Sequence, residues 1–176
     1  MIAQVVTIWR RSHLSGAAAI CLSLTLLGAS SLRHAPELVW NASASAPIGL
    51  YLRLSEPEPK RGDLVLLQPP PNVAKIAAVR GYLPMGVPLI KRIVALSGDT
   101  ICMDGNEVQL NGHAFVQRLN RDRRGRILPH WSGCRTLTAK QLFPVMQRVP
   151  DSFDGRYFGP LPISAIEGRM VPIWTQ

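Results

Sequence analysis

Short apolar segments separated by turn-forming clusters dominate residues 36–176, and this spacing leaves little room for long helices. The clusters are rich in Pro and Gly, of which the chain has 15 and 14, and these residues interrupt helices but suit the turns between strands. Short strands at such spacing predict a mostly antiparallel β fold. The expected strands lie within Gly49–Leu54, Asp63–Gln68, Pro88–Leu96, Thr100–Met103, Glu107–Leu110, Val145–Val149 and Arg169–Trp174.

Three local patterns refine this expectation. Asp104 and Gly105 lie between two of the apolar segments, and Asp-Gly favours a type I′ hairpin turn because both central positions need a positive φ. Asn72–Arg80 is the best candidate for a short helix, and Thr138–Leu142 is a candidate for a single helical turn. The absence of internal repeats and low-complexity tracts predicts one domain after the N-terminal segment.

The N-terminal segment contains 19 uncharged residues, Leu14–Leu32, enough for a helix that crosses a hydrocarbon core of about 30 Å. Arg10, Arg11 and His13 precede it, so the positive-inside rule places the N-terminus in the cytoplasm and the rest outside. A signal peptide cleaved at the small residues Gly28–Ser30 is the alternative. The apolar run exceeds the usual hydrophobic region of a signal peptide, about 7–15 residues, which favours a retained anchor.

The expected organisation is a cytoplasmic N-terminus with a transmembrane anchor over residues 1–35, followed by an exported domain over residues 36–176. An exported domain meets oxidising conditions, under which Cys102 and Cys134 can form a disulfide. Two buried free thiols are the alternative, and the oxidising compartment favours the disulfide. Cys21 lies in the apolar segment, and no C-x-x-C pattern indicates a zinc or redox site.

The net charge of +9 raises the question of an anionic partner. The densest basic cluster consists of Arg118, Arg121, Arg123, Arg124 and Arg126, which could attract nucleic acid electrostatically. No aromatic residue is interleaved in that cluster, and its composition is typical of an exposed loop. We therefore interpret it as a solvated loop and expect no nucleic-acid partner.

Missing motifs exclude several enzyme classes. The chain has no G-x-S-x-G, H-E-x-x-H, P-loop or G-x-G-x-x-G pattern. Its four histidines give a Ser-His-Asp triad poor support, since His13 and His34 flank the apolar segment while His113 and His130 lie beside the arginine cluster.

Two segments carry residues suited to chemistry. Asn41–Tyr51 is rich in Ser and Ala, and on its own it is typical of a flexible tether. In the second segment Lys91 lies in the middle of an apolar run, on one face with Leu89 and Ile93. Burial would lower the pKa of Lys91, and its neutral amine could then take a proton from a serine hydroxyl. The alternative is an edge-strand lysine whose ammonium reaches water, and the segment alone favours that alternative.

Taken together, the ordered motifs of the chain resemble those of the type I signal peptidase family. After the apolar segment come a Ser-x-Pro motif at Ser45–Pro47 and a Gly-Asp-x-Val motif within Lys60–Val65. A Lys-Arg-Ile-Val-x-Leu-x-Gly-Asp motif follows at Lys91–Asp99, and Ser152–Pro160 is similar to a Ser-x-Asp-Ser-Arg block that ends in Gly-Pro. The similarity covers residues 10–170 in the same order, and it implies an antiparallel β domain behind one transmembrane helix.

Within that family the chain is most similar to the conjugative-transfer branch, the TraF-like peptidases. This similarity rests on the short length of the chain and on the motif Asn-x-Ser-x-Ser-x-Pro-x-Gly-Leu-Tyr. Ala46 stands where other branches have Met, and Ser97 where they have Pro. Gly155 replaces the usual Ser of the third block, so a hydrogen bond from that side chain is lost.

The resemblance implies a role for each matching residue. Ser45 is expected to be the nucleophile and Lys91 the general base of an acyl-transfer reaction that needs no cofactor and no metal. The Ser43 hydroxyl and the backbone N–H of Ser45 are expected to form the oxyanion hole. Ser152 is expected to orient the lysine. Asp154 and Arg156 are expected to pair as structural support.

The resemblance also implies a place and a substrate. We expect a bacterial inner-membrane protein with its peptidase domain outside the cytoplasm, cutting membrane-bound preproteins or conjugative prepilins after small residues. The bilayer and a conjugation or secretion apparatus are the other expected partners. Trp40 is a candidate for a membrane-interface contact or for core packing. The alternative function is a catalytically inactive anchored β domain that serves as a structural component of such an apparatus.

Overall fold

The structure, a computed structural model, describes residues 37–55 and 58–176. The predicted anchor, Leu14–Leu32, and Cys21 lie outside the described residues. Within the described ranges, no helix has both the length and the apolar character that a membrane crossing requires. Residues Glu37–Gln176 form one compact unit.

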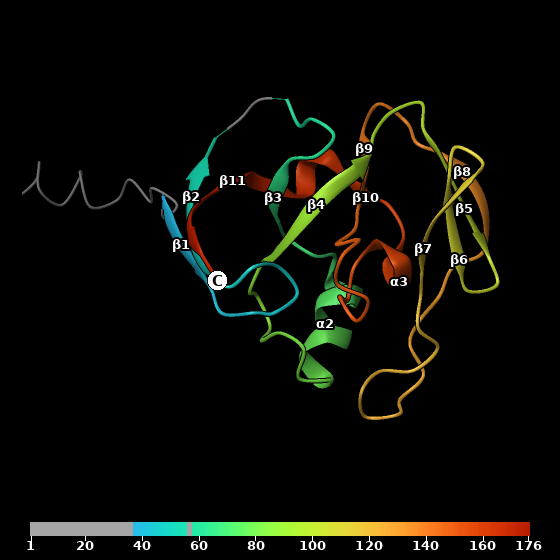
Figure 1. The fold of residues 1–176 in the computed structure, drawn as a ribbon, viewed down its shortest axis with the longest axis horizontal. Coiled ribbons are helices and arrows are strands. Elements are labelled where there is room, and N and C mark those ends of the chain that lie inside the picture. Colours follow the sequence, from blue (N-terminus) through green and yellow to red (C-terminus); the bar gives the residue numbers. More distant parts are fainter. Residues whose placement is uncertain (1–36, 56–57) are drawn as a thin grey trace, which may run out of the picture. The chain divides into compact units, whose positions relative to one another are not determined.

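A seven-stranded sheet forms the main body of this unit, and every neighbouring pair in it is antiparallel. This confirms the predicted antiparallel β fold of the domain. Figure 1 shows the sheet extending from β1 to β9 and β10. Its strands, in spatial order, are β1 (Leu38–Asn41), β2 (Gly49–Leu54), β11 (Ile166–Thr175), β3 (Leu64–Leu67), β4 (Leu89–Ala95), β9 (Gln141–Pro144) and β10 (Leu161–Pro162).

The position of β11 in this order matters for the site. It follows all other strands in sequence but lies between β2 and β3. Its backbone approaches β2 so closely at Gly49 that an added Cβ would lie 2.0 Å from the carbonyl oxygen of Trp174. Gly49 also has a φ of 153°, so a residue without a side chain is required there.

A second sheet of four strands lies beside the first, in the order β7 (His113–Gln117), β6 (Glu107–Leu110), β5 (Thr100–Asp104) and β8 (Gly133–Thr136). Cys102 on β5 faces Cys134 on β8, and a disulfide joins the two strands. The buried residues that connect the sheets are Val94, Ala95, Ile101, Met103, Val108, Leu137, Phe143 and Val145.

The hairpin between β5 and β6 differs from the prediction. Its two central residues are Gly105 and Asn106, and of these only Gly105 has a positive φ. A glycine at the first central position is typical of a type II′ turn, so the type I′ assignment at Asp104 is wrong. The next hairpin has positive φ at both Asn111 and Gly112, as type I′ turns require.

Helices are few and short in the described residues. The predicted helix is confirmed as α2 (Pro71–Val79), which begins where a proline is tolerated, and α3 (Gly155–Phe158) and a 3₁₀ turn (Ile163–Ala165) follow later. Thr138–Leu142 is not helical: the amide of Gln141 donates to the carbonyl of Thr138, and the chain then enters β9.

Val145–Val149 is also not a strand, because side chains occupy its backbone polar groups. The Asp154 carboxylate accepts from the amide of Met146, while Arg156 donates to the carbonyl of Val149. The remaining predicted strands correspond to observed ones with ends that differ by three residues at most.

The Gly98-Asp99 motif, which follows β4, helps to join the two sheets. Both carboxylate oxygens of Asp99 accept from Arg61 Nη2, at 2.7 and 2.6 Å, and the carboxylate also accepts from the Asn111 side-chain amide and the Leu96 backbone amide. Arg61 precedes β3 and Asn111 lies in the β6–β7 turn, so this single carboxylate fixes three chain segments. The Gly98-Asp99 motif therefore has a structural role: it holds these segments together.

Candidate active site

The loop between β1 and β2 carries Ser43 and Ser45, and one buried side chain holds it in shape. The Asn41 side-chain amide donates to the carbonyls of Ser43, Ala46 and Pro47 at 2.9, 3.1 and 2.9 Å. Its oxygen accepts from the amide of Ser43 at 3.0 Å. The Tyr51 hydroxyl adds a 2.6 Å bond to the Pro47 carbonyl. This segment is therefore an ordered turn, and its interpretation as a flexible tether is wrong.

Lys91 lies on β4, which is bounded on both sides by β3 and β9. Its side chain is fully buried. The Nζ atom lies 2.9 Å from Ser45 Oγ and 3.0 Å from Ser152 Oγ, donating to both. The interpretation of Lys91 as an edge-strand lysine that reaches water is therefore wrong, because its strand is internal.

Burial disfavours the charged ammonium and lowers the pKa of Lys91 from 10.5 to about 8. Two buried charges act on it in opposite directions: the field of Asp154 raises the pKa, while that of Arg156 lowers it. Because these two charges form a pair, their effects oppose each other at Nζ. Near neutral to mildly alkaline pH, Lys91 thus has an accessible neutral form next to a serine hydroxyl.

Ser43 and Ser45 contact each other directly. Their Oγ atoms lie 2.9 Å apart, and the amide of Ser45 donates to Ser43 Oγ at 3.3 Å. The two groups predicted to form the oxyanion hole, the Ser43 hydroxyl and the Ser45 amide, thus lie together. In this arrangement the amide donates to the hydroxyl oxygen. Rotation of the Ser43 side chain about χ1 would free both for a substrate carbonyl oxygen.

Ser152, Asp154 and Arg156 form a buried block behind the lysine. The Arg156 guanidinium binds both carboxylate oxygens of Asp154, at 2.9 and 2.8 Å. It also donates to the carbonyls of Val149 and Pro150 at 2.7 and 2.9 Å. Arg156 therefore shapes the turn that presents Ser152 to Lys91.

Close packing against β9 explains why residue 155 is a glycine. An added Cβ would lie 2.7 Å from a ring carbon of Phe143 and 2.8 Å from the Pro144 carbonyl oxygen. Any side chain here would displace β9, so the glycine accommodates the phenylalanine.

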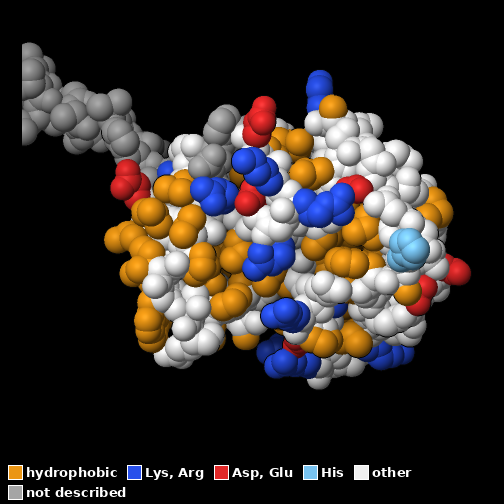
Figure 2. Space-filling model, turned by 45° about the horizontal axis from the view of Figure 1, so that its top comes forward, with side chains coloured by type: hydrophobic (Ala, Val, Ile, Leu, Met, Phe, Trp, Pro, Cys, Tyr) orange, Lys and Arg blue, Asp and Glu red, His pale blue; other side chains and the backbone are white. Residues whose placement is uncertain are grey.

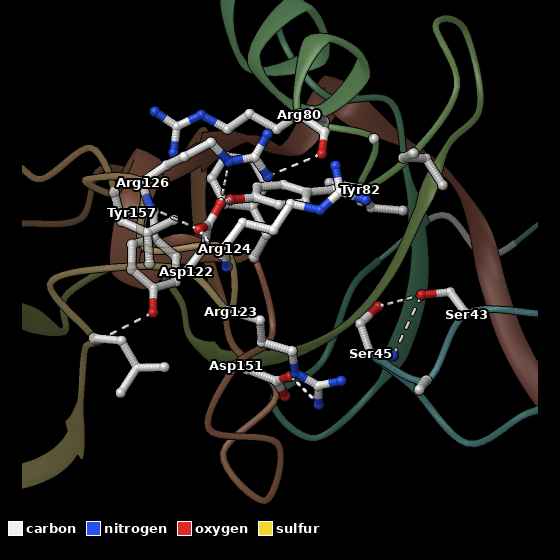
Figure 3. Close-up of a pocket in the computed structure, with 18 of the residues that line it drawn as sticks. Ser43, Ser45, Arg80, Tyr82, Asp122, Arg123, Arg124, Arg126, Asp151 and Tyr157 are labelled. Atoms are coloured by element: carbon white, nitrogen blue, oxygen red, sulfur yellow. Dashed lines mark hydrogen bonds and ion pairs between the residues drawn. The ribbon is translucent and has the colours of Figure 1, made fainter.

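A cavity of about 340 Å³ opens beside these residues, lined by Ser43, Ser45 and Lys91. Four arginines line it as well, one just after α2 and three in the 119–128 loop, and Figure 3 shows them across the cavity from Ser43 and Ser45. They are Arg80, Arg123, Arg124 and Arg126. Three of these belong to the cluster interpreted as a solvated loop; the loop is largely exposed, and it also forms a wall of the cavity.

The remaining candidates lie elsewhere. The Cys102–Cys134 disulfide is in the smaller sheet and does not line the cavity.

Trp40 on β1 is 57% exposed and stacks on Trp174 of β11, with ring centroids 5.9 Å apart, so it is not a core residue. Leu38 and Ile173 are exposed on the same two strands, and Figure 2 shows hydrophobic side chains gathered at that end of the domain. Within the described ranges, no group of His, Cys, Asp and Glu is arranged to hold a metal ion.

Two contributions were missed at the level of sequence. Asn41 carried a usable signal, because an Asn at the start of a turn often bonds the backbone that follows it. Arg80 carried none, because its place at the cavity depends on how α2 packs under the 119–128 loop.

Comparison with known proteins decides the family. The family model described as "Signal peptidase, peptidase S26" matches residues 10–175. The chain belongs to this family. It is 31% identical over 162 residues to a plasmid transfer protein TraF of Escherichia coli, covering 87% of this chain and 90% of that protein. It is 33% identical over 150 residues to the conjugal transfer protein TraF of Agrobacterium fabrum, covering 77% and 81%.

These relatives confirm the similarity of this S26 member to the conjugative-transfer branch. Among solved structures, a signal peptidase I from Enterococcus faecalis matches with a TM-score of 0.39 and 18% identity, covering 66% of this chain and 100% of that one.

Proposed function

We propose that this S26 member is a membrane-anchored serine endopeptidase in which Ser45 is the nucleophile and Lys91 the general base. One observation carries the proposal: a fully buried lysine amine, with a pKa lowered to about 8, lies 2.9 Å from a serine hydroxyl at the edge of a cavity. A buried, deprotonatable amine in hydrogen-bond reach of a hydroxyl is the pairing that nucleophilic catalysis without histidine requires.

The reaction follows from this pairing. Neutral Lys91 takes the proton of Ser45 as Oγ attacks the scissile carbonyl, and the resulting ammonium returns a proton to the leaving amine. The backbone N–H of Ser45 and the turned Ser43 hydroxyl stabilise the oxyanion. A water molecule, or an amine of the substrate in a cyclising reaction, then attacks the acyl-enzyme. Ser152 holds the lysine at 3.0 Å throughout.

Family membership and the transfer proteins among the relatives support an exported precursor, such as a conjugative prepilin, as the substrate. The Leu14–Leu32 segment would anchor the chain in the bacterial inner membrane with the peptidase domain on the outer side. The exposed Trp40–Trp174 stack is suited to the lipid interface, where aromatic rings are enriched. Substrates would then meet Ser45 as they emerge from the bilayer.

Cleavage of a precursor and its pH dependence test the proposal. The full chain in detergent should convert a candidate prepilin to a shorter or cyclised product, identified by mass spectrometry, while Ser45→Ala protein serves as the blank. We expect kcat/KM to rise about tenfold per pH unit and to level off above a midpoint near pH 8, because only the neutral amine of Lys91 accepts a proton. An intact precursor, or a rate independent of pH between about 6 and 9.5, would contradict the proposal.

Asn41→Asp tests whether the loop geometry supports the nucleophile. The substitution is nearly isosteric but places a carboxylate oxygen against three carbonyls that now accept hydrogen bonds. We expect kcat to fall about 10²-fold with a smaller change in KM, since displacing a reacting group by about 1 Å has an effect of that size. Asn106→Asp, on the exposed β5–β6 turn, is the control and should leave kcat unchanged.

A further inference from the structure

The cavity wall across from Ser45 is positively charged in a way that the proposed reaction does not use. Four arginines and Lys91 line the cavity, whereas only two acidic residues, Asp122 and Asp151, do so. A hollow lined by one sign of charge attracts the opposite charge. The question is which arginines are already neutralised within the protein.

The loop that carries most of this charge is held in a fixed shape. Asp122 accepts from the backbone amides of Arg124 and Arg126, both at 2.9 Å, and from the Tyr82 hydroxyl at 2.5 Å. The amide of Leu119 donates to the Tyr157 hydroxyl at 3.1 Å. The arginines are thus presented on a preorganised support, which reduces the ordering entropy that a ligand must overcome.

Two of the arginines have partners. Arg126 donates to Asp122 at 2.7 Å and to the Arg80 carbonyl at 3.0 Å. Arg123 forms an ion pair with Asp151. These contacts already engage donors of both guanidinium groups within the protein.

The other two arginines are different. The Arg124 side chain is exposed at the cavity and has no ion pair or hydrogen bond among the described residues. Arg80 Nη1 is buried and, within the described part of the chain, has no hydrogen-bond acceptor. A buried guanidinium N–H without an acceptor is uncommon in folded proteins. Both groups are suited to an anionic oxygen that comes from outside the domain.

We infer that Arg124, supported by Arg80, binds a carboxylate of the peptide substrate while the scissile bond lies at Ser45. This inference rests on the proposed peptidase function and specifies its substrate class. The carboxylate is either an acidic side chain near the cut or the C-terminal carboxylate of the substrate. A planar guanidinium can bind either through two parallel hydrogen bonds.

Matched peptides test the inference. The parent peptide spans the cut site of a candidate prepilin, with Ala-x-Ala before the cut and no acidic residue. One series places a single Glu, or a single Gln, at each position on either side of the cut, and another compares a free C-terminal acid with its amide. The measured quantities are kcat/KM for the full chain, and binding to Ser45→Ala protein by fluorescence anisotropy.

We expect at least one Glu position, or the free C-terminal acid, to raise kcat/KM and affinity about tenfold over its neutral match, as charge-assisted hydrogen bonds do. Arg124→Gln should abolish that ratio, and Arg124→Glu should invert it. Arg148→Gln, an exposed arginine outside the cavity lining, is the control and should leave both the ratio and the basal rate unchanged.

The outcomes separate the two proposals. Cleavage without any preference for Glu or the free acid, or a preference that survives Arg124→Gln, overturns the carboxylate site and leaves the peptidase standing. Absence of cleavage overturns the peptidase, and the anisotropy ratio then decides the carboxylate site by itself. Equal binding of the Glu and Gln peptides overturns it.

Discussion

Removing either the hydroxyl of Ser45 or the amine of Lys91 is expected to stop precursor cleavage almost completely. Ser45→Ala leaves no atom to form the acyl bond, and Lys91→Met removes the base that lies 2.9 Å from the hydroxyl. Because nucleophile and base act as a unit, each single variant and the double variant should lose about 10⁴-fold or more in kcat. Single-turnover rates on a candidate prepilin measure the loss, and rates in the double variant that fall by the product of the two single losses would contradict a shared step.

Stability distinguishes a lost base from a damaged fold. In wild type, the folded-state pKa of Lys91 is about 8 against 10.5 when unfolded, so below pH 8 the ammonium is present in both states and folding buries it at a penalty of about 3 kcal/mol. The penalty disappears as the pH rises from about 8 to 10.5, so the free energy of unfolding should rise across that window.

Lys91→Met should remove this rise and be no less stable than wild type at pH 7, because it replaces a buried cation by an apolar chain of similar length. Denaturant titrations at several pH values measure the effect. The control is Lys75→Met, on the exposed side of α2, which should keep both the pH-dependent rise and the activity.

Arg156→Met is expected to have the largest effect on stability. The side chain is 1% exposed and pairs with Asp154, which is fully buried. Removing one partner leaves an uncompensated buried carboxylate, and such changes lower the free energy of unfolding by about 3–5 kcal/mol. The surviving Asp154 charge also lies close enough to raise the pKa of Lys91, so the midpoint of the pH–rate profile should move upward.

Two comparisons make this prediction specific. Arg123→Met breaks the exposed pair with Asp151 and should change the free energy of unfolding by less than about 1 kcal/mol. The double variant Asp154→Asn with Arg156→Met removes both charges and should return the pH midpoint toward its wild-type value. If Arg156→Met does not fold, Arg156→Lys keeps the charge but loses the forked contacts, and it should retain the midpoint while losing stability. A midpoint unchanged in every folded Arg156→Met sample would show that the pair has no electrostatic effect on the lysine.

Much of the fold could be predicted from local pattern. The apolar segments that became β2, β3, β4, β5 and β6 carry their own strand preference and their own turn residues, and α2 begins with a proline at a position where helices tolerate it. The exposed strand β8 could not be predicted in this way, because all four of its residues are exposed and it forms by pairing with β5.

The site shows the same division. The resemblance to the signal peptidase family predicted that Ser45, Lys91 and Ser152 would meet, but the sequence could not show that Lys91 is enclosed. Enclosure depends on β3 and β9 flanking β4, and β9 begins some fifty residues later in the chain. The arginine wall could not be predicted for a related reason: Arg124 is a polar loop residue by composition, and only packing against α2 and Tyr82 turns its loop toward Ser45.

The place of β11 has a consequence for the timing of biosynthesis. The loop with Ser45 leads into β2, Lys91 lies on β4 beside β3, and β11 supplies the hydrogen-bonded connection between β2 and β3. A ribosome makes β2 and β4 long before β11, so a nascent chain already contains both residues but lacks the strand that brings them into register. If the chain is the exported peptidase that we propose, a newly made molecule would stay inactive until β11 has been synthesised and has paired with β2 and β3.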